Sequence, residues 1–139
     1  MASEQEAFHE LCAYTLTHGD PQFIHQHVVD AYAAQHATPV SKPIGLTFAL
    51  AGLYLHVEKS YTGRDVQLAH MKMARQKREW PKWTLPTNRG DITATQVLAA
   101  SEGSERDDLI DAWCKSVWSA FAPANRDTMI QLLAEYRLA

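Results

Sequence analysis

The densest group of side chains able to do chemistry lies in one short segment, residues 25–36. Imidazole and carboxylate groups bind metal ions, while hydroxyl and amide groups form hydrogen bonds with polar ligands. The segment spans about three turns of a helix, so these groups are spread over neighbouring stripes of its surface. We expect the binding residues of the protein to be His27, Asp30, Tyr32, Gln35 and His36.

A metal site is the sharpest hypothesis for this segment. His27 and Asp30 are three residues apart, so on a helix both side chains could face one divalent ion, such as zinc, nickel or iron. A third ligand must then come from another helix, and the candidates are His9, His56, Glu58 and His70. An ion with an open coordination position could activate water, which would make the protein a small helical-bundle metalloenzyme.

A second interpretation is that the same polar groups bond inside the fold. Asp30 and Tyr32 can bond to neighbouring backbone or side chains, and His36, near the end of the helix, can bond to the last carbonyl groups. We favour this second interpretation, in which no cofactor is required and the chain is a non-enzymatic helical binding or interaction module that associates with itself; the metalloenzyme is the alternative. The sequence leaves open whether the protein is an enzyme.

Signatures of other enzyme classes are missing from the sequence. Glu6 and His9 have the Glu-x-x-His spacing of di-iron bundles, but no second copy accompanies them. The serines lie in no Gly-x-Ser-x-Gly elbow, and the glycines form neither a P-loop nor a dinucleotide-binding pattern. The basic segment 75–83 contains Trp80 and Trp83 and could contact nucleic acid. A solvated helix beside a tryptophan-anchored loop fits the acidic total charge better.

The composition describes one domain without a strong electrostatic field. The chain, taken as a single helical domain over residues 1–139, carries a formal net charge of −3, which favours neither nucleic acid nor an anionic membrane as a partner. The N-terminal residues lack the apolar core of a signal peptide, so we expect a cytoplasmic protein. The longest apolar run, residues 44–57, is too short to span a bilayer. Cys12 and Cys114 belong to no metal or disulfide motif and are expected to be free thiols.

The elements that position these residues are predicted to be helices throughout. Apolar residues recur with the helical period in nearly every segment, and none alternates with the period of two that marks a half-buried strand. We expect an all-α fold, a single compact bundle of about six helices around a central apolar helix that opens at Pro43. Caps and prolines place helix starts at Ser3, Asp20, Pro43, Thr93, Ser104 and Pro123, and a further helix is expected after the turn at Thr62-Gly63. Gly45 and Gly52 share a face of the central helix, where they would allow a neighbouring backbone to approach closely.

Several short strings, in this order and spacing, match a known family. They are residues 8–11, 29–36, 80–81, 85–86, 112–113 and 117–118, with Gly90 and Thr93 between them, and the most specific is Asp30-Ala31-Tyr32 followed by Gln35-His36. Over most of its length the chain therefore resembles an uncharacterised bacterial family of unknown function, DUF5946. The resemblance implies a bacterial origin and a helical domain, and it brings no catalytic residue. The cysteine cluster of many members is missing here, so no zinc knuckle is implied.

Overall fold

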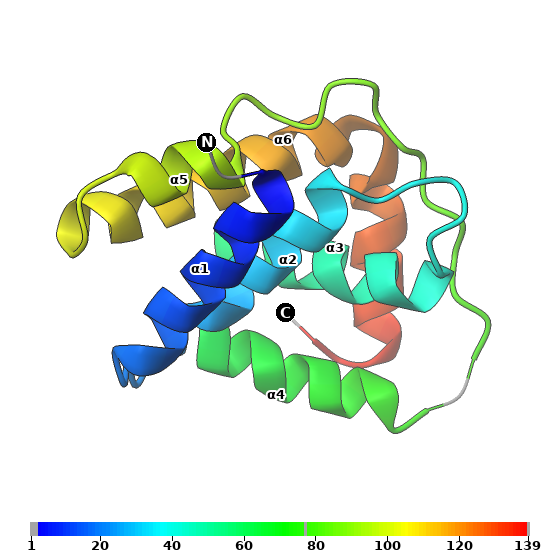
Figure 1. The fold of residues 1–139 in the computed structure, drawn as a ribbon. Coiled ribbons are helices and arrows are strands. Elements are labelled where there is room, and N and C mark those ends of the chain that lie inside the picture. Colours follow the sequence, from blue (N-terminus) through cyan, green and yellow to red (C-terminus); the bar gives the residue numbers. More distant parts are fainter. Residues whose placement is uncertain (1–2, 77, 139) are drawn as a thin grey trace.

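The computed structural model describes residues 3–76 and 78–138, and these residues form six α-helices and no strand. In chain order the helices are α1 (Glu4–Thr17), α2 (His25–Gln35), α3 (Pro43–Lys59), α4 (Gly63–Ala74), α5 (Ala94–Ala99) and α6 (Ser104–Glu135). Figure 1 shows α2 and α3 in the middle of the molecule, with α1, α4 and α6 around them. The predicted all-α fold is confirmed.

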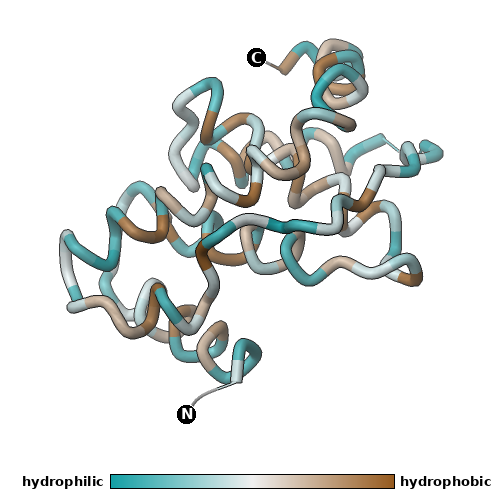
Figure 2. The backbone as a smooth tube through the Cα atoms, turned by 90° about the horizontal axis from the view of Figure 1, so that it is seen from above, coloured by the Kyte–Doolittle hydropathy of each residue, from teal (hydrophilic) through white to brown (hydrophobic). Residues whose placement is uncertain are grey.

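The central apolar helix that the sequence predicts is α3. Its residues 46, 47 and 49–55 are all buried, and it packs against α2, α4 and α6. Along the chain as a whole, Figure 2 shows hydrophobic and hydrophilic stretches alternating, as expected for helices that turn one face toward a core. None of the helices in the described ranges combines the length and the apolarity needed to cross a membrane.

The close contact between α2 and α3 depends on one of the two glycines of α3. A Cβ atom at Gly52 would overlap with the carboxylate of Asp30 in α2 and would lie 3.1 Å from Val66 Cγ1 in α4. For Gly45, no described atom lies within 4 Å of the position of its Cβ. Gly52 therefore does allow a close approach, but of the Asp30 and Val66 side chains rather than of the predicted backbone, and the prediction is wrong for Gly45, which lies in the exposed first turn of α3.

The start of α2 is later than the sequence predicts. The sequence places it at Asp20, but the helix begins at His25. The carboxylate of Asp20 accepts hydrogen bonds from the backbone N–H groups of Gln22 (2.9 Å) and Ile24 (2.8 Å), and Phe23 has a positive φ of 58°. A non-glycine residue in this left-handed region interrupts a helix, so the carboxylate of Asp20 stabilises a turn instead.

The last helix is longer than the sequence predicts, because α6 continues through Pro123. The sequence predicts a separate helix at this proline, since a proline inside a helix lacks the N–H that bonds four residues back and tends to kink the axis. Figure 1 shows α6 changing direction in its second half, and buried residues from both halves belong to the same core. The start of α6 also differs by one residue, because Ser104 is already helical and Gly103, with φ 101°, precedes it.

The long segment between α4 and α5 is held to the helices by side chains. Figure 1 shows it running along the edge of the molecule from the end of α4 to the start of α5. Trp83 is buried, and its Nε1–H donates to Thr47 Oγ1 in α3 at 2.8 Å. The amide of Asn125 in α6 accepts from the backbone N–H of Thr84 (2.8 Å) and donates to the carbonyl of the same residue (2.9 Å). The predicted tryptophan-anchored loop is confirmed at Trp83.

The predicted self-association rests on the idea that aromatic residues form an exposed patch. Trp83, Trp113 and Trp118 are buried, and Trp80 is half-buried against the ring of Phe48. These rings therefore do not form such a patch. Self-association stays a prediction, which light scattering would test.

Candidate functional site

The polar residues predicted for function divide between the two ends of α2. Tyr32, Gln35 and His36 belong to its C-terminal end, whereas His27 and Asp30 belong to its N-terminal half. The two groups also differ in exposure, since His36 reaches the solvent while His27 and Asp30 are buried.

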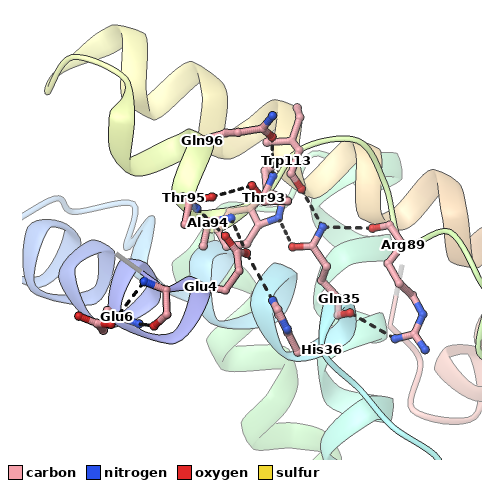
Figure 3. A network of polar contacts seen from close by, with 12 residues as sticks. Glu4, Glu6, Gln35, His36, Arg89, Thr93, Ala94, Thr95, Gln96 and Trp113 are labelled. Atoms are coloured by element: carbon pink, nitrogen blue, oxygen red, sulfur yellow. Dashed lines mark hydrogen bonds and ion pairs between the residues drawn. The ribbon is translucent and has the colours of Figure 1, made fainter. Parts of the chain in front are cut away.

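At the C-terminal end, Gln35 uses its side-chain amide to join three parts of the chain. Its Nε2 donates to the carbonyl oxygens of Arg89 (3.3 Å) and Ile92 (2.7 Å), and its Oε1 accepts from the indole N–H of Trp113 in α6 (3.0 Å). Figure 3 shows Gln35 between Arg89 and Trp113. Both donors of the amide are therefore engaged, and Gln35 fixes the segment before α5 against α2 and α6.

The guanidinium of Arg89 returns to the end of α2. Its NH1 donates to the carbonyl oxygens of Ala34 (3.3 Å), Gln35 (3.3 Å) and Ala37 (2.8 Å). The last carbonyl groups of a helix have no partner within the helix, and a cation there also interacts favourably with the helix dipole. Arg89 is thus the C-terminal cap of α2, a role that the sequence did not indicate because Arg89 lies more than 50 residues away.

Glu4 joins the start of α5 to the end of α2. Its two carboxylate oxygens accept from the backbone N–H groups of Ala94 (3.0 Å) and Thr95 (2.9 Å), the first residues of α5. Burial alone would raise the pKa of Glu4, but the hydrogen bonds from Thr95 and Ala94 outweigh it and the pKa is lowered. His36 Nε2 lies 3.5 Å from Glu4 Oε1, and the ring of Tyr32 lies against that of His36 at 4.2 Å between centroids. In Figure 3 the carboxylate of Glu4 faces both Ala94 and His36. The structure thus engages Gln35 in hydrogen bonds within the fold, Tyr32 in ring contacts with Phe8 and His36, and His36 in a contact with Glu4.

At the N-terminal half of α2, His27 borders a half-enclosed pocket of about 540 Å³. The pocket lies where α2, α3 and α6 meet the turns before α2 and before α4. Its lining includes Gln22, Ile24, His27, His56, Tyr61 and Asp111. His27 is 6 % exposed, so its ring forms part of the pocket wall.

The wall beside His27 is a pair of stacked histidine rings. The rings of His27 and His56 lie 3.6 Å apart between centroids, with 23° between their planes. His56 Nδ1 is 2.8 Å from the carbonyl oxygen of Tyr61, and its Nε2 is 2.7 Å from Asp111 Oδ1. Both neighbours of His56 are hydrogen-bond acceptors, so the geometry requires an N–H at both ring nitrogens. The other oxygen of Asp111 pairs with Lys115 Nζ at 3.0 Å.

The imidazole of His27 is neutral in the folded protein. Burial, and to a smaller extent the neighbouring ring of His56, lower the pKa of His27 to about 3, against weaker opposite effects of Asp111 and Asp20. A neutral imidazole has one N–H donor and one acceptor nitrogen. His27 therefore presents a neutral ring to the pocket, stacked on a charged one.

Asp30 lies one turn further along α2, away from the solvent. It is 3 % exposed; its Oδ1 accepts from Gln26 Nε2 at 3.0 Å, and its Oδ2 has no hydrogen-bond partner among the described residues. Burial raises the pKa of Asp30 well above its ordinary value, against the smaller effect of the bond from Gln26. Burial therefore favours the protonated form of this carboxyl group, which lies next to Gly52, where a side chain would overlap with it.

Cys114 is the other buried reactive group near this position. Its thiol donates to the carbonyl oxygen of His27 at 3.6 Å, and burial raises its pKa well above the ordinary value. The thiol is therefore an inert part of the core. Cys12 is also free, as the sequence predicts.

Replacing Asp30 with asparagine should change how stability depends on pH. The pKa of Asp30 is higher in the folded protein than in the unfolded chain, where it is about 3.9, so folding favours the protonated form. Below about pH 4 the carboxyl is protonated in both states and does not oppose folding. As the pH rises from there toward the folded pKa, the parent should lose up to about 1.4 kcal/mol per pH unit relative to Asp30→Asn. Urea unfolding of both proteins from about pH 4 to pH 7 measures this loss, and a difference independent of pH would contradict the buried neutral carboxyl.

The four proposed third ligands for a metal have different surroundings. His56 lies beside His27, but both of its ring nitrogens already face oxygen atoms. The partners of the other three are Arg126 and Trp118 for Glu58, the carbonyl of Phe48 for His70, and the ring of Phe8 for His9. Within residues 3–76 and 78–138, no group of three or more His, Cys, Asp or Glu side chains is arranged to hold a metal ion.

Sequence reasoning missed two residues of the pocket, Asp111 and Lys115. They are four residues apart on α6 and form a pair that is common on solvated helix faces. The signal that could have singled out Asp111 is its position directly after Ile110, at the border of the apolar face of α6. From the sequence alone, that position is equally compatible with an exposed carboxylate.

The fold and the pocket define an all-α domain with a polar, half-enclosed pocket at the meeting point of three helices. The model of a family of unknown function, DUF5946, matches residues 4–122, and the chain belongs to this family. The matched range contains both the Gln35 network and every residue that lines the pocket. Comparisons with curated proteins and with solved structures give no match.

Proposed function

We propose that this protein is a small-molecule binding module whose ligand occupies the pocket beside His27. The observation that carries the proposal is the convergence of polar groups from three helices, His27, His56 and Asp111, at a pocket of about 540 Å³. Small-ligand sites are typically pockets of roughly 300–1,000 Å³ with apolar lining and a few placed polar groups. Ile24 and Val57 supply apolar lining here.

Two buried residues at or near the pocket reduce the stability of the folded protein, and this cost supports a binding role. Burial lowers the pKa of His27 and raises that of Asp30, so both residues make the folded state less stable than apolar residues of the same size would. If these two residues had no function, apolar residues would be expected at their positions, because they would make the folded state more stable. Buried ionisable groups with shifted pKa values are for this reason concentrated at functional sites.

Binding without catalysis fits the protonation of the site better than acid–base chemistry does. A general base works best when its pKa lies near the working pH, and His27, with a pKa of about 3, is a weak base at neutral pH. His56 is bonded to Asp111 and to the carbonyl of Tyr61, so a proton transfer to a ligand would break one of these bonds. A neutral His27 is instead well suited to donate or accept one hydrogen bond.

Filling the pocket should abolish the binding of small ligands. The probes are small organic fragments that include carboxylic acids, amides, amines and neutral aromatics, with zinc chloride as a separate probe. Val57→Trp adds a large ring at the pocket, and Leu68→Trp adds the same ring at an exposed position of α4. Saturation-transfer NMR should detect fragments that bind the parent and Leu68→Trp but not Val57→Trp.

Circular dichroism of both variants verifies that they are folded. Fragments that bind all three proteins equally, or an absence of binding to the parent, would contradict the proposal. Zinc binding by the parent that is lost in His27→Ala would instead favour the metalloenzyme alternative.

A further inference from the structure

The polar groups at the pocket leave positive charge and hydrogen-bond donors in excess. One oxygen of Asp111 is bonded to His56 and the other to Lys115, so this carboxylate is already paired on both sides. His56, with both ring nitrogens donating, and Lys115 each carry a positive charge, whereas His27 is neutral. The charged side chains that line the pocket therefore leave one positive charge without a partner.

The other acidic groups near the pocket lie outside its lining. Asp20 influences the pKa of His27, but it does not line the pocket and accepts two backbone N–H bonds of its own turn. Asp30 is fully buried, and its raised pKa favours the neutral acid. Glu58 faces another partner, since it pairs with Arg126 of α6 at 2.7 Å.

We infer that the pocket takes a small organic carboxylate, with its carboxylate group at Lys115 and His27 and its apolar body against Ile24 and Val57. This inference rests on the proposed function, because it names the ligand class of the same pocket. Lys115 is 60 % exposed at its side chain and has two further N–H donors beyond its bond to Asp111. His27 can supply one more donor from its neutral ring.

A monoanion fits the charge of the pocket better than the other simple ligand classes. An amine or a metal ion would approach two positive charges, those of His56 and Lys115, whose one counter-charge is already bonded. A phosphate dianion would exceed the single unpaired positive charge, and it would leave the apolar wall of Ile24 and Val57 without a contact. A carboxylate on a hydrocarbon body satisfies both parts of the pocket.

Three probes of nearly equal shape separate the effect of ligand charge on affinity from that of ligand shape. They are 3-phenylpropanoate, 3-phenylpropanamide and 3-phenylpropylamine. Isothermal titration and ligand-observed NMR measure their dissociation constants, with inorganic phosphate as a fourth probe. Ligands of this size reach dissociation constants on the order of 0.1–1 mM. The carboxylate should bind at least about tenfold more tightly than the amide, and the amine and phosphate should be weaker still.

Replacing one lysine inside the pocket and one outside it tests whether the carboxylate binds at the pocket. Lys115→Gln should weaken the binding of 3-phenylpropanoate by about fivefold, the effect of one exposed ion pair, and leave that of the amide unchanged. Lys72→Gln, at an exposed position of α4 outside the pocket, should change neither. Both lysines are exposed, so neither replacement should affect folding.

The possible outcomes test separately whether the pocket binds a ligand and whether that ligand is a carboxylate. Equal or tighter binding of the amide or the amine, lost in Val57→Trp, would overturn the carboxylate inference and leave the binding proposal intact. A preference for phosphate over the carboxylate would likewise overturn the inference. Binding of the carboxylate that is equal in the parent and in Val57→Trp would overturn both.

Discussion

Replacing Gly52 with alanine should destabilise the protein by about 2–3 kcal/mol. The new Cβ would overlap with the carboxyl group of Asp30, which is buried in the contact between α2 and α3. The loss should appear although alanine is the better helix former by about 1 kcal/mol. Chemical unfolding followed by circular dichroism measures the free energy of unfolding of parent and variant.

The same helix provides the control for this prediction. Gly45 has open space at the position of its Cβ, so Gly45→Ala should stabilise the protein by about 0.5–1 kcal/mol. In an Asp30→Ala background the overlap is removed, and Gly52→Ala should cost much less than in the parent. An equal cost of Gly52→Ala in both backgrounds would show that Asp30 is not what Gly52 accommodates.

Replacing Gln35 with leucine should cost roughly 3 kcal/mol. Leucine has a similar volume, but it would leave the indole N–H of Trp113 and the carbonyl groups of Arg89 and Ile92 without their partner. Leaving a buried polar group without a partner costs more free energy than a hydrogen bond contributes on balance to stability. Urea unfolding, followed by the fluorescence of the buried tryptophans, gives the difference from the parent.

The matched control for Gln35 is Gln131, an exposed residue of α6. Gln131→Leu should change the free energy of unfolding by less than about 0.5 kcal/mol. A similarly small change for Gln35→Leu would mean that the Gln35 amide does not hold the segment before α5 in place.

The helical period was sufficient to predict the fold class and the central helix. A helix that is apolar on every side must be surrounded by others, and α3 is. The period did not locate the helix ends at Asp20 and Pro123, because these depend on local backbone geometry and on the packing of distant residues. At Asp20 the positive φ of Phe23 interrupts the helix, and at Pro123 a shared core keeps both halves in one helix.

The candidate site was predictable only in part, because periodicity shows which residues share a face and not which distant residues meet them. His27 and Asp30 were singled out by residue type and spacing. The partners that determine their chemistry, such as His56, Asp111 and Gly52, come from other helices. For the same reason, the internal role of His36 became apparent only through Glu4, which lies at the far end of the sequence.

The central claim is that His27 and His56 form the wall of a ligand pocket, and the ¹⁵N NMR spectrum of the histidine rings tests it most directly. At pH 7 the ring of His27 should give the signals of a neutral imidazole, and the ring of His56 should give N–H signals at both nitrogens, because each of them faces an oxygen acceptor. On addition of 3-phenylpropanoate the signals of these two rings should shift, while that of His9, an exposed residue of α1, should stay in place. Ring signals of His27 and His56 that remain unchanged at saturating ligand would contradict the account.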